Sequence, residues 1–294
     1  MHKFLRAAGF SSVKKSEMQS IVSRIPAEYD RYANAISSEN EEIVEYMKLF
    51  GSRFGVCVCG EYTNEGNFLE EYYYPFLIGE IGTQIHYLEV SRRTEKEAYA
   101  GICDEPNIGV PIIFYLQNMT EYLNAHFIGI RHNSKEEVVF SGLSCEGRIL
   151  LPVHKSPEAE RKNDKLFKNR SSLVEAARNG DDSAIETLTL EDMDIYADIS
   201  VRVEEEDILS IVETSFMPWG IESDEYTIVG EILKFKEEVN YLTGETVVML
   251  RLVCNKLVFD ICINRNDLLG EPAVGRRFRG NVWIQGRINY SYDS

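Results

Sequence analysis

The residues of this chain that are best suited to binding chemistry lie on one predicted strand near the carboxyl end, from Arg277 to Tyr290. Successive side chains of a β-strand point to opposite faces. One face of this strand carries phenylalanine, glycine, valine and isoleucine, which indicates a buried side. The other face is cationic, amide-bearing and aromatic, and we predict that it points outward. Its members are Arg277, Arg279, Asn281, Trp283, Gln285, Arg287 and Asn289.

Arginine and tryptophan on an open sheet face suit anionic or aromatic ligands, and such faces recur in platforms for single-stranded nucleic acid. The structural alternative is that arginine stems cover the indole, and that the face is solvated or packed on another part of the chain. The predicted binding residues are Arg277, Arg279, Trp283, Gln285 and Arg287.

The distribution of charge offers a third interpretation of this face. The net charge is −17. Residues 171–250 carry 4 basic and 20 acidic residues, whereas residues 251–294 carry 7 basic and 4 acidic residues. The acidic segment could therefore dock within the molecule on the arginine-bearing face. As a whole, the chain would be repelled by nucleic acid and by anionic membranes, so a nucleic-acid partner is unfavoured but stays open.

The sequence nominates no catalytic residue, metal site or cofactor. Gly142 to Gly147 resembles a nucleophile elbow with one residue too many, and a strand follows where the elbow needs a helix, so we interpret it as a hairpin turn. Cys57 and Cys59 share a strand face, but no third or fourth metal ligand can be named, and buried thiols are the simpler interpretation.

The order of patterns along the chain predicts an α+β protein in several parts. Residues 1–153 form an α+β domain that starts with helices, including segments 27–36 and 41–50, and continues as an antiparallel sheet. A charged linker (154–170) and an acidic helical connector (171–222) follow. Residues 223–294 are all β and fit a small barrel of the oligonucleotide-binding type or a compact sandwich.

Two local features support the strand prediction in this last part. Asn255 and Lys256 form a plausible two-residue hairpin turn. The apolar phase slips between Ile232 and Leu233, which suggests a bulge near Gly230.

The chain resembles an uncharacterised family from clostridia-type bacteria. The resemblance rests on MHKFLRAAGF at the start, SIVETSFMPWGIESDEYTIVGEI in the middle and DLLGEPAVGRRFRGNVWIQGRI near the end. That family has no assigned activity, so the resemblance implies an intracellular bacterial protein and no catalytic residue.

Three functional hypotheses follow. The leading one is a non-enzymatic cytoplasmic interaction or scaffold protein that uses the outer face of the last strand for a protein partner or for its own acidic segment. The second is a binder of single-stranded nucleic acid or another anionic ligand on the same face. The third is an enzyme with a pocket near Tyr72 to Tyr74, which perturbed carboxylates converging in a cleft would support. No apolar run is long enough to span a membrane.

Overall fold

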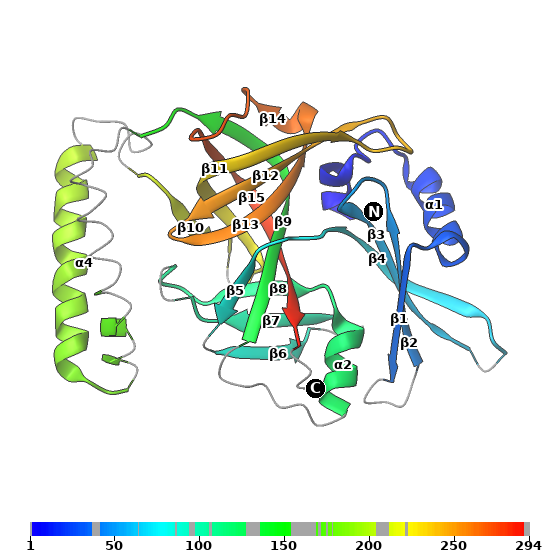
Figure 1. The fold of residues 1–294 in the computed structure, drawn as a ribbon, viewed down its shortest axis with the longest axis horizontal. Helices are drawn as coiled ribbons and strands as arrows, with labels where there is room; N and C mark the ends of the chain where they lie inside the picture. Colours follow the sequence, from blue (N-terminus) through cyan, green and yellow to red (C-terminus); the bar gives the residue numbers. More distant parts are fainter. Residues whose placement is uncertain are drawn as a thin grey trace.

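The computed structural model gives the fold of most of the chain (Figure 1). It describes residues 2–36, 42–63, 65–85, 87–93, 98–105, 108–127, 136–153, 169, 172–174, 176–177, 179–203, 212–220 and 223–290. Strands dominate, in one antiparallel sheet and one larger mixed sheet, so the predicted α+β class is confirmed. The helices with described bounds are η1 (Lys3–Ala8), α1 (Lys15–Glu28), α2 (Met119–Phe127), α4 (Asp182–Val203) and η2 (Arg265–Asp267), of which η1 and η2 are 3-10 helices.

The smaller sheet has four strands in the order β1–β2–β3–β4. Helix α1 packs on one of its faces through the buried side chains of Met18, Val22 and Ile25. The helices predicted over 27–36 and 41–50 are therefore wrong where the structure describes them, apart from the last turn of α1. The strands of this sheet are β1 (Arg31–Ile36), β2 (Glu42–Leu49), β3 (Phe54–Tyr62) and β4 (Phe68–Leu77).

The physical reason for this error is that β2 is buried on both faces. Four consecutive residues, 43–46, are buried, because α1 covers one face and the larger sheet covers the other. A strand buried on both sides loses the polar–apolar alternation that identifies strands, and a short apolar run does not distinguish strand from helix. The antiparallel pairing with β3 shows that this segment is a strand.

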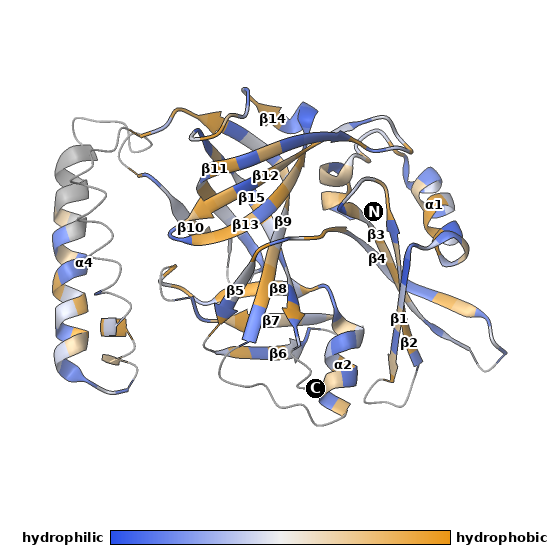
Figure 2. Ribbon diagram, in the orientation of Figure 1, coloured by the Kyte–Doolittle hydropathy of each residue, from blue (hydrophilic) through white to orange (hydrophobic). Residues whose placement is uncertain are grey.

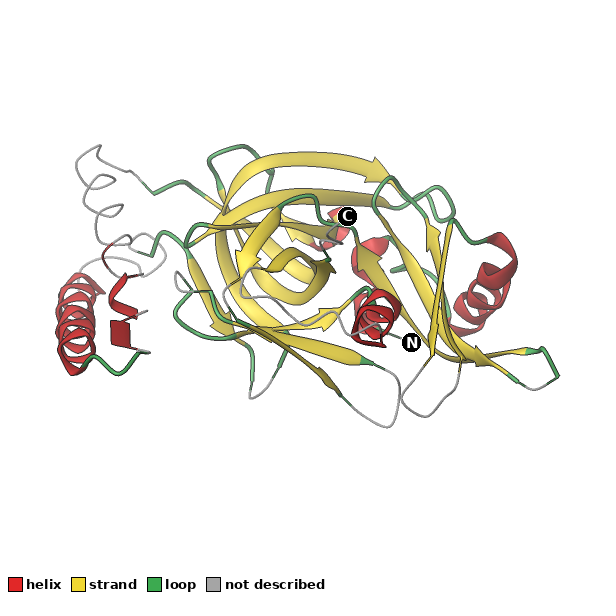
Figure 3. Cartoon of the chain, turned by 60° about the horizontal axis from the view of Figure 1, so that its bottom comes forward, coloured by secondary structure: helices red, strands yellow, loops and turns green. Residues whose placement is uncertain are grey.

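The larger sheet follows the path β10–β11–β12–β13–β9–β15–β8–β7–β6, and β11 also pairs with β15. That extra pairing closes β11, β12, β13, β9 and β15 into a five-strand ring, which Figure 3 shows curling around the middle of the molecule. Ring neighbours are antiparallel except β13 and β9, which are parallel. The strands are β5 (Gly82–Ile85), β6 (Leu88–Arg92), β7 (Tyr99–Cys103), β8 (Ile112–Leu116), β9 (Glu136–Leu150), β10 (Ser215–Pro218), β11 (Glu225–Val239), β12 (Thr246–Cys254), β13 (Leu257–Asn264), β14 (Leu268–Leu269) and β15 (Arg277–Asn289).

The local predictions for the carboxyl-terminal strands are confirmed. Asn255 and Lys256 form the turn between β12 and β13, and both have positive φ, 47° and 70°. Two positive φ angles match the twist of the flanking strands. The register between β11 and β12 shifts between Ile232 and Lys234, where the apolar phase slips.

Two hydrophobic cores follow from this arrangement. The first fills the ring and includes the buried side chains of β15 that were predicted to point inward: Phe278, Val282, Ile284 and Ile288. The second lies between the outer face of the ring and the four-stranded sheet, and it takes in buried residues of η1 and α1. We use "outer face" for side chains of the ring strands that point away from the ring interior. Part of that outer face is therefore inside the protein.

The sheet crosses the predicted domain boundaries. Strand β9, from the segment before residue 153, pairs with β13 and β15, which both follow residue 223. Strand β8 also pairs with β15. The division at residues 153 and 223 stays a prediction, but the described strands on its two sides share one hydrogen-bonded sheet. Residues 154–168 of the predicted linker lie outside the described residues.

The acidic connector is only partly helical in the described part. Helix α4 (Asp182–Val203) stands to one side of the strands and carries both hydrophilic and hydrophobic residues (Figures 1 and 2). The prediction of a helical connector over residues 171–222 is wrong near its end, because residues 215–218 are strand β10 and pair with β11. Among the described residues, no helix combines the length and the apolarity that crossing a bilayer requires.

Candidate functional site

The predicted strand exists, but its polar face is not open along its length. Strand β15 spans Arg277–Asn289 and so ends one residue before the predicted end at Tyr290. Arg277 and Trp283 are each only 5% exposed, and Gln285 is fully buried. These three side chains are thus covered by other parts of the chain, which agrees with the structural alternative that this face packs within the protein. The five predicted binding residues separate into a covered group and the two arginines 279 and 287.

Trp283 is covered by the amino-terminal segment of the chain. Its ring stacks on Phe4, with centroids 5.4 Å apart, and lies 5.2 Å from the ring of Tyr115. Its indole nitrogen Nε1 donates a 2.7 Å hydrogen bond to Oδ2 of Asp224. Arg93 pairs with the same carboxylate at 2.6 Å. The indole thus has packing partners and a satisfied N–H, which is what a buried tryptophan requires.

The side chains of Gln285 and Arg277 also hydrogen-bond within the protein. Gln285 Nε2 donates to the carbonyl of Pro75 at 2.9 Å, and its Oε1 accepts from Nε2 of Gln117 at 2.7 Å. Arg277 donates to the carbonyls of Leu151 and Val212 at 2.9 and 2.7 Å. Burial lowers the pKa of Arg277 below its usual value. These side chains join separate elements and have no free face for a ligand.

The remaining part of the outer face is hollowed. Arg279 and Asn281 line a hollow of about 370 Å³, which is bounded by strands β9 and β15, the β10–β11 turn and the η2–β14 segment. Trp219, in that turn, is 56% exposed and lines the same hollow. Guanidinium and indole groups therefore do meet here, although the indole belongs to Trp219 and the predicted one was Trp283. The other lining residues include Glu146, Arg148, Thr227, Asp267 and Leu269.

Two arginines face each other across the strands of this hollow. Arg148 on β9 is directly opposite Arg279 on β15. Within the part of the chain that the structure describes, neither guanidinium has a hydrogen-bond or ion-pair partner. The nearby acids are engaged elsewhere: Glu146 accepts from the Asn281 side chain at 2.9 Å, and Asp267 pairs with Arg6. Like charges placed directly opposite on neighbouring strands are destabilising.

The fifth predicted residue, Arg287, lies at the other end of β15 and lines a second hollow. Its guanidinium pairs with Glu121 of α2 at 2.7 Å. This hollow, of about 300 Å³, lies between β1 and β2, α2 and the end of β15, and Arg31 and Asn118 also line it. Arg279 and Arg287 thus line different hollows, so the structure does not bring the five predicted residues together.

The second hollow contains a carboxyl group that sequence reasoning missed. Glu45 is 4% exposed, and its Oε2 accepts hydrogen bonds from the Thr120 hydroxyl at 2.7 Å and the Thr120 backbone N–H at 3.3 Å. Burial raises the pKa of Glu45 to about 7, against the smaller opposing effect of the Thr120 hydrogen bonds. Glu45 had no signal in the sequence, since it is one acid within an apolar stretch that was interpreted as a helix.

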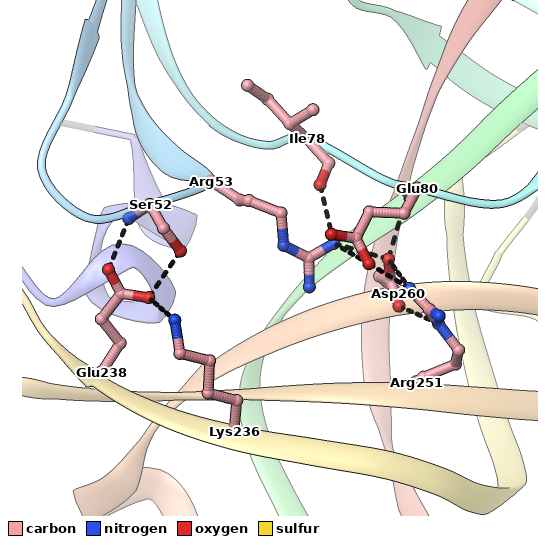
Figure 4. Close-up of polar contacts among 8 residues, drawn as sticks. All are labelled: Ser52, Arg53, Ile78, Glu80, Lys236, Glu238, Arg251 and Asp260. Carbon is pink, nitrogen blue, oxygen red and sulfur yellow. Dashed lines mark hydrogen bonds and ion pairs between the residues drawn. The ribbon is translucent and has the colours of Figure 1, made fainter.

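A third charged group joins the two sheets at their edge (Figure 4). Arg53, just before β3, donates to Oδ2 of Asp260 on β13 at 2.7 Å. Arg251 on β12 holds both oxygens of the same carboxylate, at 2.9 and 3.1 Å, and also pairs with Glu80. Burial by itself raises the pKa of Asp260, but the hydrogen bonds from the two arginines outweigh it and lower that pKa. Every charge in this group is matched, so we assign it a structural role.

The segment interpreted as a hairpin turn, Gly142 to Gly147, is instead the middle of strand β9. Ser144 Oγ lies 2.8 and 2.7 Å from the backbone carbonyl oxygens of Glu146 and Asn281, and its single O–H can donate to either of them. The register against β15 shifts at Asn281 and Val282, so an extra residue on β9 accounts for the irregular pattern. The Ser144 hydroxyl satisfies the backbone at this bulge.

Comparison with known proteins identifies the family. The model of a family described as a domain of unknown function, named from an E. rectale gene description (DUF3881), matches residues 5–286. The chain belongs to this bacterial family, which confirms the resemblance found in the sequence. Comparisons with curated proteins and with solved structures gave no match.

Proposed function

We propose that this member of the family is a binding protein for a small anionic ligand with a flat ring, held in the hollow of Arg148, Arg279 and Trp219. The observation that carries the proposal is the pair of directly opposed guanidinium groups, which have no partners among the described residues. This refines the predicted use of the outer face of the last strand. In this proposal Arg279 is still a binding residue, and Trp219 has the role that was predicted for Trp283.

The chemistry of the hollow selects the ligand class. An anion placed between Arg148 and Arg279 would relieve their repulsion and receive charge-assisted hydrogen bonds from both. Arginine matches the planar oxygen geometry of phosphates and carboxylates. The exposed Trp219 ring adds a flat apolar surface on which a heterocycle can stack. A phosphate monoester attached to a heterocyclic ring has both features.

We further propose that the ring is a small barrel of the oligonucleotide-binding type. Support comes from its antiparallel run β11–β12–β13 and its closure through β9 and β15. Such barrels bind oligonucleotides on the face of their second and third strands. The corresponding face of β12 and β13 is covered here, because Val247, Met249 and Cys262 are buried in the second core. This favours a small ligand at the open β9–β15 part over a long strand of nucleic acid.

Tryptophan fluorescence provides a direct test. The chain has two tryptophans, and Trp219 is the exposed one, so a ligand in the hollow should change its emission. Adenosine monophosphate is the probe, compared with adenosine and inorganic phosphate. We expect the nucleotide to bind more tightly than either part alone, because only it engages both the arginines and the indole.

Matched variants locate the binding. Arg148→Gln with Arg279→Gln should weaken nucleotide binding at least tenfold, because a hydrogen bond to a charged group is worth about 1.5–3 kcal/mol. Trp219→Ala should weaken it, and Trp219→Phe should restore part of the loss. Arg24→Gln on α1 is the control, an exposed arginine far from the hollow in the chain, and should bind like the parent.

Two results would overturn the proposal. One is the absence of binding for every phosphate-bearing probe at low salt while the protein is folded. The other is unchanged binding in the double arginine variant. A single-stranded oligonucleotide that binds more tightly than the nucleotide, with a steep salt dependence, would replace the proposal by the nucleic-acid hypothesis.

The other predicted roles are not supported by a comparable observation. Docking of the acidic segment on the arginine face stays a prediction, since residues 204–211 lie outside the described part, and α4 stands apart from the ring in Figures 1 and 3. A protein partner, a cytoplasmic location and an enzymatic role also stay predictions.

A further inference from the structure

Two thiols and a carboxyl group converge in the layer between the four-stranded sheet and the ring. Glu45 on β2 is directly opposite Cys59 on β3, and Cys57 is two residues away on the same face. One carboxylate oxygen of Glu45 and the two sulfur atoms all lie within 4.8 Å of one another. All three side chains are buried. The sequence showed the two cysteines on one face, and the fold adds a third potential ligand from the neighbouring strand.

The spacing of the sulfur atoms fits a shared metal ion. The two Sγ atoms are 3.9 Å apart. Two thiolates bound to one tetrahedral zinc ion, with Zn–S distances of about 2.3 Å, have their sulfurs about 3.8 Å apart. A disulfide needs an S–S distance of about 2.05 Å, so the observed spacing belongs to two separate thiols. The sulfur positions therefore need almost no movement to take up an ion, whereas the carboxylate oxygen would move slightly inward.

The carboxyl group supplies a second, independent reason. Glu45 is buried and has no cationic partner in the part of the chain that the structure describes: its hydrogen bonds come from Thr120, and Arg287 pairs with Glu121. Burying an unpaired carboxylate is unfavourable, so buried charges are normally paired or coordinate metals. A divalent ion would provide the missing positive charge.

We propose that Glu45, Cys57 and Cys59 form a binding site for one thiophilic divalent cation, of which zinc is the natural example. Two thiolates and one carboxylate supply three ligands of a tetrahedral ion and leave its fourth position free. Glu45 also lines the 300 Å³ hollow, so the site borders this hollow through its carboxyl group.

The surroundings contain the outer-shell donor that metal thiolates usually have. The Tyr72 hydroxyl hydrogen-bonds to Cys59; burial raises the pKa of this thiol well above its usual value, and the contact with Tyr72 opposes that rise. Metal-bound ligands are commonly oriented by such second contacts. Binding would release the thiol protons to solvent, since the thiolate is the metal ligand. This site is separate from the Arg148–Arg279 hollow, so the two proposals stand or fall independently.

Cobalt(II) is the probe that reads out the ligands directly. Tag-free full-length protein, stripped with a chelator and kept reduced, is titrated with Co²⁺. We expect one ion per chain, a sulfur-to-cobalt charge-transfer band and the visible bands of a tetrahedral ion. Zinc should then displace the cobalt and remove the colour. Elemental analysis gives the stoichiometry.

Single-residue variants assign the ligands. Cys57→Ser and Cys59→Ser should each lose most of the charge-transfer band. Glu45→Gln should keep the sulfur band but bind cobalt at least about tenfold more weakly, because even outer-shell changes cost that much. Cys145→Ser is the matched control, since Cys145 is a half-buried thiol on β9 whose sulfur contacts the Lys3 carbonyl. It should bind like the parent.

Two outcomes would overturn the proposal. One is folded parent protein, verified by circular dichroism, that shows no thiolate–cobalt band. The other is a band that survives in both serine variants or disappears in Cys145→Ser. If a serine variant fails to fold, the parent spectrum and Glu45→Gln still decide the question. Arg148→Gln with Arg279→Gln should leave cobalt binding unchanged, which separates this result from the nucleotide test.

Discussion

The outer face of the ring contains two regions that have similar residues and different surroundings. In the covered region, Trp283 and Gln285 pack against the amino-terminal segment and β4, and their polar atoms are bonded within the protein. In the open region, Arg148, Arg279 and Trp219 line a hollow, and the arginines have no partner among the described residues. An indole with polar neighbours is a structural element in the first region and a candidate ligand contact in the second.

The difference teaches that residue type on a strand face does not by itself indicate function. Packing converted the covered region into a core, because η1 and the four-stranded sheet lie over it. Replacing a residue of the covered region by a smaller one should lower the free energy of unfolding. The same replacement in the open region should leave it almost unchanged. The following predictions test this contrast.

The largest contrast is between the two tryptophans. Trp283→Ala should lower the free energy of unfolding by about 3–5 kcal/mol, the usual loss for a buried large aromatic residue. Trp219→Ala, at a surface position, should change it by no more than about 0.5 kcal/mol. Urea denaturation of both variants measures this difference. Equal losses would show that the two regions are not distinct.

The junction at the border of the covered region should be the next most sensitive. Asp260→Asn leaves Arg53 and Arg251 facing each other without the carboxylate, and should cost about 3 kcal/mol at pH 7. Glu80→Gln is the matched control in the same network. Its carboxylate is 48% exposed, so it should cost at most about 1 kcal/mol.

The pH dependence of this junction has a definite sign. The arginines hold the pKa of Asp260 below its usual value, so its stabilisation is present above about pH 4 and is lost as the pH falls through the lowered pKa. The stability difference between the parent and Asp260→Asn should therefore shrink below pH 4. A difference that stays constant down to pH 2 would contradict the ion-pair assignment.

A polar residue of the covered region should also be structural. Gln285→Leu would remove the side-chain donor to the Pro75 carbonyl and the side-chain acceptor of the Leu77 N–H and of Gln117 Nε2, and a buried polar group left unsatisfied costs about 1–3 kcal/mol. We expect a loss of about 2 kcal/mol, measured by urea denaturation. The same change at Asn281, on the open region, should cost less than half as much.

The smallest effect has the opposite sign. Arg148→Gln alone removes one of two opposed positive charges, so it should stabilise the ligand-free protein by a few tenths of a kcal/mol, about the size of a cross-strand pair term. The gain should disappear in 1 M salt, where the Debye length falls to about 3 Å. Thermal denaturation at two salt concentrations measures it. Destabilisation at low salt would mean that Arg148 has a stabilising partner.

Most of the carboxyl-terminal strands could be predicted because their signals are local. Two-residue turns and phase slips, as at Asn255 and Ile232, depend on neighbours in the sequence. Strand β2 could not be predicted, since burial on both faces hides its period. Strand β1 is mostly exposed, with one buried residue, so it has no apolar alternation to identify it. The cluster of Glu45, Cys57 and Cys59 could not be predicted either, because strand pairing alone brings Glu45 next to Cys59.

The sequence by itself determined the two faces of β15, since alternation along an extended chain is a property of local geometry. It also determined membership in the family. Only the tertiary structure decided which parts of the polar face are accessible, because the segments that cover Trp283 come from the opposite end of the chain. Their position depends on the burial of apolar surface between distant segments, which no local pattern records.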